Sequence, residues 1–293
     1  MDLNSYMLGK KQSIDKFLDS LVPENEEIPV ITDAMRYSLF AGGKRLRPIL
    51  ALMACEMFGG NEDEVLPFAC CIELIHTYSL IHDDLPAMDN DDFRRGKLTN
   101  HKVYGEGFAV LAGDALLNQA FEIMSDIITK KPRIEYIKTM NTISRASGVN
   151  GMIGGQCIDL YFENKNIDID TLKNMHNKKT GAIITASLAA GALIAGAAEQ
   201  DVKSMEQFGA IIGLAFQVTD DILDVEGTIE KIGKSTNKDL AKNKSNFISF
   251  YGLQQSKRIA SDLISEAKKV ISAYGAKGYY LSELANYISS RDN

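Results

Sequence analysis

Apolar residues recur at steps of three and four along most of the chain, a spacing that places them on one face of an α-helix. The clearest early example comprises Met35, Leu39, Leu46, Ile49, Leu50 and Met53. Alternating apolar and polar positions, which would predict β-strands, are scarce. The pattern therefore predicts an all-α protein.

Clusters of Gly, Pro, Asn and charged residues interrupt this pattern and predict helix ends. They fall at residues 22–29, 59–61, 130–132, 163–168, 227–246 and 274–278. The segments between them make roughly ten helices with short connections and no linker-like stretch. We therefore predict that residues 1–293 form a single domain, a helical bundle around a central cavity.

Residues 181–198, GAIITASLAAGALIAGAA, form an apolar segment about as long as a membrane crossing requires. Ala, Gly, Ser and Thr supply most of it, so it offers little large aliphatic surface. Small residues let neighbouring helices approach closely. We predict a buried central helix here rather than a membrane span.

The amino-acid composition excludes some classes of function for this chain. The chain is 45% hydrophobic and 24% charged, and its net charge of -7 excludes the basic field that nucleic-acid binding requires. The cysteines have no metal-ligand spacing and are predicted to be reduced core residues: Cys55, Cys70, Cys71 and Cys157. The first residues lack the apolar core of a signal peptide, so a cytoplasmic location is expected.

Three aspartates lie in the sequence HDDLPAMD, where a helical pattern ends. Pro86 disfavours a regular helix at the residue before it, so Asp83 and Asp84 should lie at a helix C-terminus. The helix dipole is negative there and adjacent acids repel, so a cationic partner is required. A distorted exit turn at Pro86 would bring Asp89 back beside them. Such oxygen ligands suit Mg²⁺, which commonly bridges carboxylates to substrate phosphates.

A second acidic motif, FQVTDDILD, contains Asp220, Asp221 and Asp224, and we expect it also to end an apolar helix. Spacings of three and four residues place these acids on one helix face, where they would repel one another without a cation. One such motif alone is more typical of a solvated acidic helix end. Two motifs after long apolar helices favour a metal site, and if the helices are neighbours, six acids face one cavity.

Basic residues cluster near both motifs. They are Lys44, Arg45 and Arg47 in GGKRLRP, Arg94 and Arg95, Lys178 and Lys179 before Thr180, Lys234, and Lys244. Each alone is more typical of a solvated surface. Together they indicate two diphosphate sites, one reached through metal ions and one bound directly by Arg and Lys.

Six segments, in this order along the chain, resemble those of the trans-isoprenyl diphosphate synthase family, most closely its bacterial farnesyl diphosphate synthases. They are GGKRLRP at 42–48, HDDLPAMDNDDFRRG at 82–96, GQCIDL at 155–160, KKTGA at 178–182, FQVTDDILD at 216–224 and GKST at 233–236. The resemblance covers nearly the whole chain. It implies an all-α bundle around a deep cavity, usually a homodimer, that condenses a short allylic diphosphate with isopentenyl diphosphate.

The resemblance also implies roles for individual residues. Three Mg²⁺ ions would be held by Asp83, Asp84, Asp89 and Asp220, with Asp224 a weaker candidate. The allylic diphosphate would contact Arg94, Lys179 and Lys234, with Lys244 in the same loop. Isopentenyl diphosphate would contact Lys44, Arg47, His76 and Arg95. The developing cation would face Thr180 and Gln217, and the reacting tails would lie near Gln156 and Asp159. His82 is expected to be an ordinary packed residue.

Tyr78 lies five residues before Asp83, or about 7.5 Å back along a helix axis at about 1.5 Å per residue. A rigid ring there could form the floor of a cavity for a growing hydrocarbon tail, whereas Ser79 is too small. Bacterial farnesyl synthases are similar in having an aromatic residue at this position and two extra residues between the second and third aspartates. The resemblance therefore implies a C15 product, with C10 and C20 as alternatives.

Three other classes fit the pattern less well. A class I terpene cyclase would not need the cations Lys44, Arg47 and Arg95 or a second aspartate motif. A metal-dependent phosphohydrolase using His82 and Asp83 would need more histidines than the four in the chain. A non-catalytic helical subunit or binding module would have degraded motifs, whereas both are intact.

Overall fold

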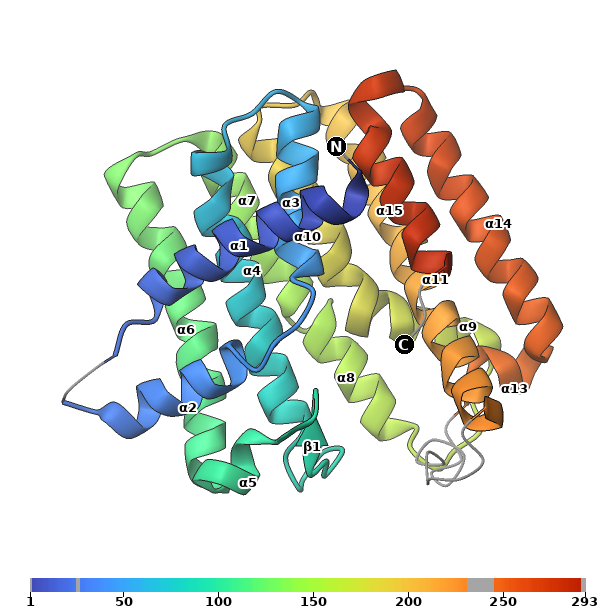
Figure 1. Ribbon diagram of the computed structural model, residues 1–293, viewed down its shortest axis with the longest axis horizontal. Coiled ribbons are helices and arrows are strands. Elements are labelled where there is room, and N and C mark those ends of the chain that lie inside the picture. Colours follow the sequence, from blue (N-terminus) through green and yellow to red (C-terminus); the bar gives the residue numbers. More distant parts are fainter. Residues whose placement is uncertain (1, 25–26, 231–244, 291–293) are drawn as a thin grey trace.

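The computed structural model describes residues 2–24, 27–230 and 245–290, and helices make up most of them (Figure 1). The first half contains α1 (Leu3–Leu21), α2 (Pro29–Leu39), α3 (Leu46–Met57), α4 (Glu62–Asp83), strands β1 (Phe93–Arg94) and β2 (Lys97–Leu98), α5 (Asn100–Tyr104), α6 (Glu106–Lys130) and α7 (Ile134–Ser147). The second half contains α8 (Met152–Tyr161), α9 (Ile169–His176), a π-helical turn (Asn177–Gly181), α10 (Ala182–Ile194), α11 (Glu199–Glu230), α13 (Phe247–Tyr251), α14 (Leu253–Ser272), a 3₁₀ turn (Gly275–Gly278) and α15 (Tyr279–Ser290).

The all-α bundle is confirmed, with more helices than the roughly ten predicted. Two five-residue helices, α5 and α13, account for part of the difference. Each is separated from the long helix after it by one glycine with a positive φ, Gly105 at 87° and Gly252 at 72°. Glycine adopts this conformation without steric cost, so a single residue is enough to turn the chain.

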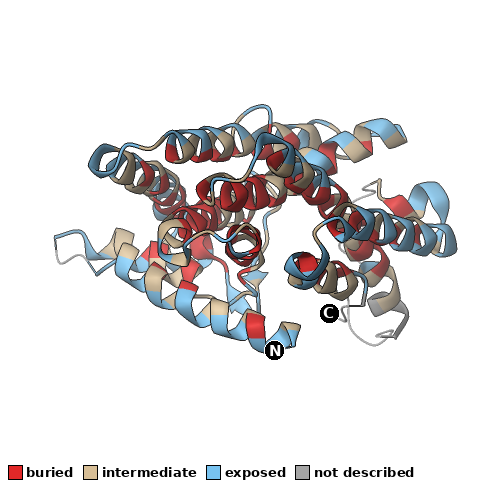
Figure 2. Cartoon of the chain, turned by 90° about the horizontal axis from the view of Figure 1, so that it is seen from above, coloured by how far each residue is buried: buried red, intermediate tan, exposed pale blue. Residues whose placement is uncertain are grey.

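The predicted buried helix is confirmed as α10, which packs against α3, α4, α7 and α11 in the middle of the molecule (Figure 1). Glycines make this packing close. A Cβ on Gly191 would lie 2.1 Å from the carbonyl oxygen of Ala51, and one on Gly209 would lie 2.7 Å from the Cα of Thr185. Buried residues concentrate in these central helices and exposed residues on the outer ones (Figure 2).

Among the described helices, α4 is the one long and apolar enough, by length and composition alone, to cross a membrane. Within its most apolar window, 67% of the residues are buried inside the protein. Buried core helices meet the same criterion. The hydrophobic cluster that contains α4 extends from α1 to α15.

A buried ion network fixes the start of α3. Arg45 is 3% exposed and has a left-handed backbone conformation. Its guanidinium donates to Asp15 Oδ1 at 2.7 Å, to Glu73 Oε1 at 2.9 Å and to the carbonyl oxygen of Leu39 at 2.6 Å. The middle cation of GGKRLRP therefore holds α1, α2, α3 and α4 together.

Arg45→Ala should lower the free energy of unfolding by about 3–5 kcal/mol, because it leaves Glu73 buried without its partner. Chemical denaturation followed by circular dichroism measures the effect. Lys16→Ala, which removes an exposed cation from α1, is the matched control and should change stability by less than about 0.5 kcal/mol. Equal stabilities of the two variants would contradict the role given to Arg45.

Candidate active site

The first acidic motif lies where α4 ends. The helix stops at Asp83, Asp84 is its C-cap, and the chain then turns through residues 84–89. The backbone N–H of Asp89 donates to the carbonyl oxygen of Asp83 at 2.9 Å, so the turn brings Asp89 back to Asp83. Both the helix end and the distorted exit turn predicted at Pro86 are confirmed.

Cationic and amide groups compensate the carboxylates at this helix end. Arg94 binds Asp84 through Nε at 2.8 and 2.9 Å and through Nη2 at 2.7 Å. Lys179 Nζ lies 3.8 Å from Asp83 Oδ1, and Gln156 donates to the same oxygen. Burial raises the pKa of Asp83 and of Asp84, whereas Lys179 and Arg94 act in the opposite direction. The required cationic partners are therefore present.

The second acidic motif lies within a helix rather than at its end, contrary to the prediction. α11 continues past Asp224 to Glu230, beyond the predicted break at residue 227. Asp221 is buried, and its Oδ2 accepts the backbone N–H of Phe247 at 2.8 Å. Asp221 thus attaches the start of α13 to α11.

Acids of the two motifs line three adjoining cavities. Asp83 lines an apolar cavity, and Asp220 lines a cationic one. A third cavity, of about 240 Å³, is lined by acids from both motifs and from α8, namely Asp89, Asp159, Asp221 and Asp224. Lys179 borders the apolar and acidic cavities, and Arg47 and Thr180 border the apolar and cationic ones, so the three spaces adjoin. In the described part of the chain, no three His, Cys, Asp or Glu side chains form a group that could hold a metal ion.

The cationic cavity has a volume of about 420 Å³ and gathers most of the predicted direct anion ligands. They are Lys44, Arg47, His76, Arg94 and Arg95. Arg47 Nη1 donates to His76 Nε2 at 3.2 Å, so that nitrogen is unprotonated and the proton of the neutral ring is on Nδ1. Burial and nearby arginines lower the pKa of His76 well below 6.5. Arg47 Nε is buried and has no hydrogen-bond partner among the residues described.

A tight hairpin separates the two adjacent arginines. In β1 and β2, Phe93 pairs with Leu98 and Arg94 with Lys97. The two turn residues, Arg95 and Gly96, have φ of 52° and 75°, which is a type I′ hairpin turn. Arg94 binds Asp84, whereas Arg95 donates to the carbonyl oxygen of Gly42. The sequence analysis did not predict this hairpin, although the Arg-Gly pair is compatible with such a turn.

The glycines of GGKRLRP make room for Arg95. Gly43 has φ of 122°, and a Cβ on it would lie 2.7 Å from Arg95 Nη1. A side chain at this position would therefore strain the backbone and also collide with the guanidinium. Lys44 is exposed and its Nζ lies 5.6 Å from the ring centre of Tyr287.

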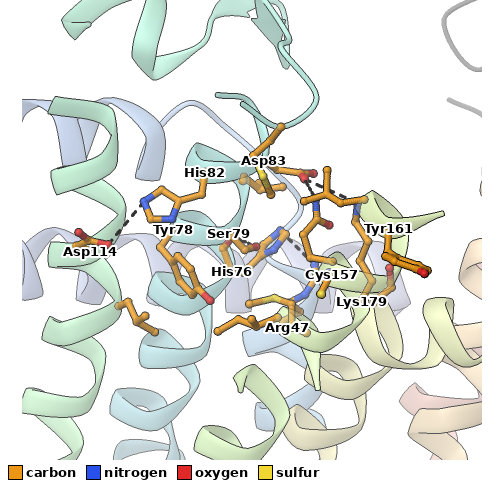
Figure 3. Close-up of a pocket in the computed structure, with 18 residues that line it drawn as sticks. Arg47, His76, Tyr78, Ser79, His82, Asp83, Asp114, Cys157, Tyr161 and Lys179 are labelled. Carbon is orange, nitrogen blue, oxygen red and sulfur yellow. Dashed lines mark hydrogen bonds and ion pairs between the residues drawn. The ribbon is translucent and has the colours of Figure 1, made fainter. Parts of the chain in front are cut away.

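The apolar cavity has a volume of about 760 Å³ and extends from Asp83 along α4 (Figure 3). Tyr78, Ser79 and His82 line it from α4, and Leu117 lines it from α6. α8 contributes Met152, Ile153, Gln156, Cys157, Leu160 and Tyr161. Cys157 is therefore exposed, contrary to the prediction that it lies in the core, while the other three cysteines are buried. Apart from Gln156, the α6 and α8 residues were not predicted, because nothing in an apolar helix face distinguishes a cavity wall from core.

Lys179 and Thr180 lie on the π-helical turn between α9 and α10. Lys179 donates to Asp159 Oδ2 at 2.7 Å, and Thr180 Oγ1 donates to Gln217 Oε1 at 3.3 Å. Adjacent residues thus reach α8 on one side and α11 on the other. π-helical turns inside α-helices are frequent at functional sites.

The structure brings most of the predicted site residues together around the three adjoining cavities. Gln156 and Asp159, given minor roles by the resemblance, make direct contacts with Asp83 and Lys179. His176 was not predicted; it is buried and stacks on Phe247 at 5.9 Å, and its Nε2 has no hydrogen-bond partner in the part of the chain that the structure describes. Lys234 and Lys244 lie outside the described residues.

Comparison with known proteins identifies relatives over the whole chain. A family model described as polyprenyl synthetase matches residues 28–275. Geranylgeranyl diphosphate synthase of Cyanophora paradoxa is 44% identical over 293 residues, covering 100% of this chain and 97% of that protein. Farnesyl diphosphate synthase of Bacillus subtilis (strain 168) is 41% identical and covers 99% of each. The crystal structure of an FPP/GFPP synthase from Zymomonas mobilis matches with a TM-score of 0.89 and 36% identity, covering 98% of this chain and 99% of that one.

Proposed function

This chain belongs to the polyprenyl synthetase family, and we propose that it condenses a short allylic diphosphate with isopentenyl diphosphate to give farnesyl diphosphate. One observation carries the proposal. An apolar cavity of about 760 Å³, lined at one end by Asp83 at the end of α4, adjoins a cationic cavity. Arg47, His76, Leu80 and Thr180 line both spaces.

The three cavities suggest how the substrates are divided. The hydrocarbon tail of the allylic substrate lies in the apolar cavity, with its diphosphate toward Asp83, Arg94 and Lys179. The diphosphate of isopentenyl diphosphate lies in the cationic cavity, which Lys44, Arg47, His76 and Arg95 line. The two reacting carbons then meet beside Thr180, which borders both spaces.

By donor chemistry the carboxylates fit the magnesium that family members generally use, although within the described residues no three of them are gathered as they would be around an ion. Asp83, Asp84, Asp89 and Asp220 offer hard oxygen ligands, the type that Mg²⁺ prefers. We propose that these residues hold three ions, which when bound would stabilise the charge developing on the leaving diphosphate. Arg94 and Lys179 pair with Asp84 and Asp159, and we propose that both side chains contact the diphosphate of the bound allylic substrate.

The chain's own residues support the remaining steps. The C–O bond of the allylic diphosphate breaks, and the diphosphate leaves with the bonding electrons. The double bond of isopentenyl diphosphate attacks the allylic cation, and a proton passes from the new intermediate to the released diphosphate. Thr180 donates a hydrogen bond to Gln217. We propose that the oxygen atoms of these two side chains stabilise the cation and that the apolar walls exclude the water that would capture it.

Product length is the least constrained part of the proposal. Relatives of similar identity include both geranylgeranyl and farnesyl diphosphate synthases, which keeps a C20 product as the second candidate. The C15 proposal rests on Tyr78, which is 5% exposed and lines the apolar cavity (Figure 3). A ring at this depth would stop a tail longer than that of farnesyl diphosphate.

We also propose a homodimer, as in the family. α6 exposes Phe108, Val110 and Leu111, and α7 exposes Ile134 and Ile137. Several large apolar residues on neighbouring helices are typical of an interaction surface.

We also propose a cytoplasmic location for this chain. The names of some relatives place those proteins in chloroplasts instead.

Product analysis of the purified full chain tests the proposal. With isopentenyl diphosphate and dimethylallyl or geranyl diphosphate, we expect a C15 product that requires Mg²⁺ and disappears when the metal is chelated. A cyclic hydrocarbon, or no condensation with either allylic substrate, would contradict it.

Asp83→Ala and Asp220→Ala should each lower turnover roughly 1,000-fold, because each removes a charged group from the cluster around the leaving diphosphate. Initial rates measure the effect, and circular dichroism should show an unchanged helical fold. Asp92→Ala is the matched control, since Asp92 is an exposed acid that pairs with Lys102 at 3.1 Å. Near wild-type turnover in the Asp83 or Asp220 variant would rule out its metal role.

Arg95→Ala should raise the KM for isopentenyl diphosphate roughly tenfold to a hundredfold, the loss expected for a charged hydrogen bond. Arg94→Ala should instead act mainly on the KM for the allylic substrate. Gly43→Ala should resemble Arg95→Ala, because the added Cβ displaces that guanidinium. Identical effects of the two arginine variants on both substrates would refute the separation of roles.

Tyr78→Ala should shift the product toward C20 or longer with little change in the rate of the first condensation, because it opens the end of the apolar cavity. Chromatography of the dephosphorylated products measures the distribution. Ser79→Ala is the neighbouring control and should leave it unchanged. An unchanged C15 product from the Tyr78 variant would show that another residue forms the floor of the apolar cavity.

A further inference from the structure

His82 lies between α4 and α6, beside Tyr78. The two residues are four apart on α4 and so share a helix face. Their rings meet edge to face, with centroids 5.6 Å apart and an angle of 83° between the planes. His82 Nε2 donates to the carbonyl oxygen of Val110 in α6 at 3.0 Å. Figure 3 shows the imidazole between Asp114 and Tyr78.

Gly113 creates the space that the imidazole occupies. A Cβ on Gly113 would lie 2.1 Å from His82 Nε2 and 2.4 Å from its Cδ2. Any side chain on Gly113 would therefore have to move the ring. On the opposite side, both His82 and Tyr78 line the apolar cavity. A displaced imidazole would move away from α6 and toward that cavity.

The ring of Tyr78 is held by packing and not by its hydroxyl. The side chain is 5% exposed, yet its hydroxyl has no hydrogen-bond partner among the described residues. An aromatic edge-to-face contact is therefore one of the specific interactions that fix the ring. Asp114 Oδ1 lies 3.9 Å from His82 Nε2, but the Asp114 side chain is 61% exposed. An ion pair this exposed contributes little energy to holding the imidazole in place.

We propose that His82, seated in the gap at Gly113, is a positioning residue that holds the ring of Tyr78 in the apolar cavity and thereby sets product length. The inference deepens the proposed chain elongation and depends on it. Removing the imidazole lets the ring of Tyr78 move toward α6, which lengthens the cavity. Adding a methyl group at Gly113 forces the imidazole toward the cavity, which shortens it.

Two single variants should therefore act in opposite directions. His82→Ala should raise the ratio of C20 to C15 product about threefold to tenfold, the range for losing one aromatic pair. Gly113→Ala should raise the ratio of C10 to C15 by a similar factor. The double variant His82→Ala/Gly113→Ala has no imidazole to displace, so Gly113→Ala should no longer shorten the product in that background.

Gly107→Ala is the matched control, because it adds the same methyl group to α6 with nothing within 4 Å. It should leave the product ratio unchanged. Product ratios and melting temperatures are measured for all four variants with the full chain, isopentenyl diphosphate and dimethylallyl diphosphate, so that C10, C15 and C20 are all products. If Gly113→Ala does not fold, the product ratios of His82→Ala and of the double variant still test the role of His82.

The outcomes separate the two proposals. Absence of any condensation product from the wild-type chain would overturn the proposed function. Condensation with the wild-type product ratio in His82→Ala would overturn only the role of His82, as would a fall in melting temperature or rate without a change in ratio. Shifts in opposite directions from the two single variants would support it.

Discussion

Negative charge at the end of a buried helix is the constraint on which the rest of the site depends. Asp83 and Asp84 lie at the negative end of the α4 dipole, and burial raises the pKa of both. The groups that compensate them come from three other elements: the hairpin, the π-helical turn and α8. The acidic cluster is therefore stable only when these elements pack onto the end of α4.

Glycine allows that packing. A Cβ on Gly155 of α8 would lie 2.2 Å from the backbone nitrogen of Lys179, and one on Gly213 of α11 would lie 2.8 Å from the Cα of Gly181. The π-helical turn is thus wedged between two helices at backbone contact distance. Protein interiors packed this closely transmit small displacements, so the positions of Lys179 and Thr180 depend on α8 and α11 as much as on their own helix.

Local patterns predicted the parts of this structure that local physics determines. The helical period, the buried α10, the helix end at Asp83 and the return of Asp89 all follow from spacing or from Pro86. The hairpin has strands too short to show alternation, and the sequence of the π-helical turn is compatible with an ordinary helix. The continuation of α11 through its acidic motif depends on tertiary contacts such as that of Asp221 with Phe247.

The same limit applies to the candidate site. GGKRLRP correctly indicated a cluster of cations, but the sequence could not show that Arg45 would be buried by Glu73 and Asp15. Nor could it show that the acids would divide among three spaces. The roles of the predicted ligands, including Lys234 and Lys244, remain predictions.

The π-helical turn also restricts how this chain can evolve. A π turn spans one more residue than an α turn, and each helical residue rotates the chain by about 100° and advances it by about 1.5 Å. A lineage that lost one residue between Asn177 and Gly181 could form a continuous α-helix. It would then rotate α9, with the buried Leu172 and Met175, relative to α10. A single-residue deletion would therefore make the helix regular but would disrupt either the site or the core. The sequence of this segment is expected to change by substitution and not by deletion.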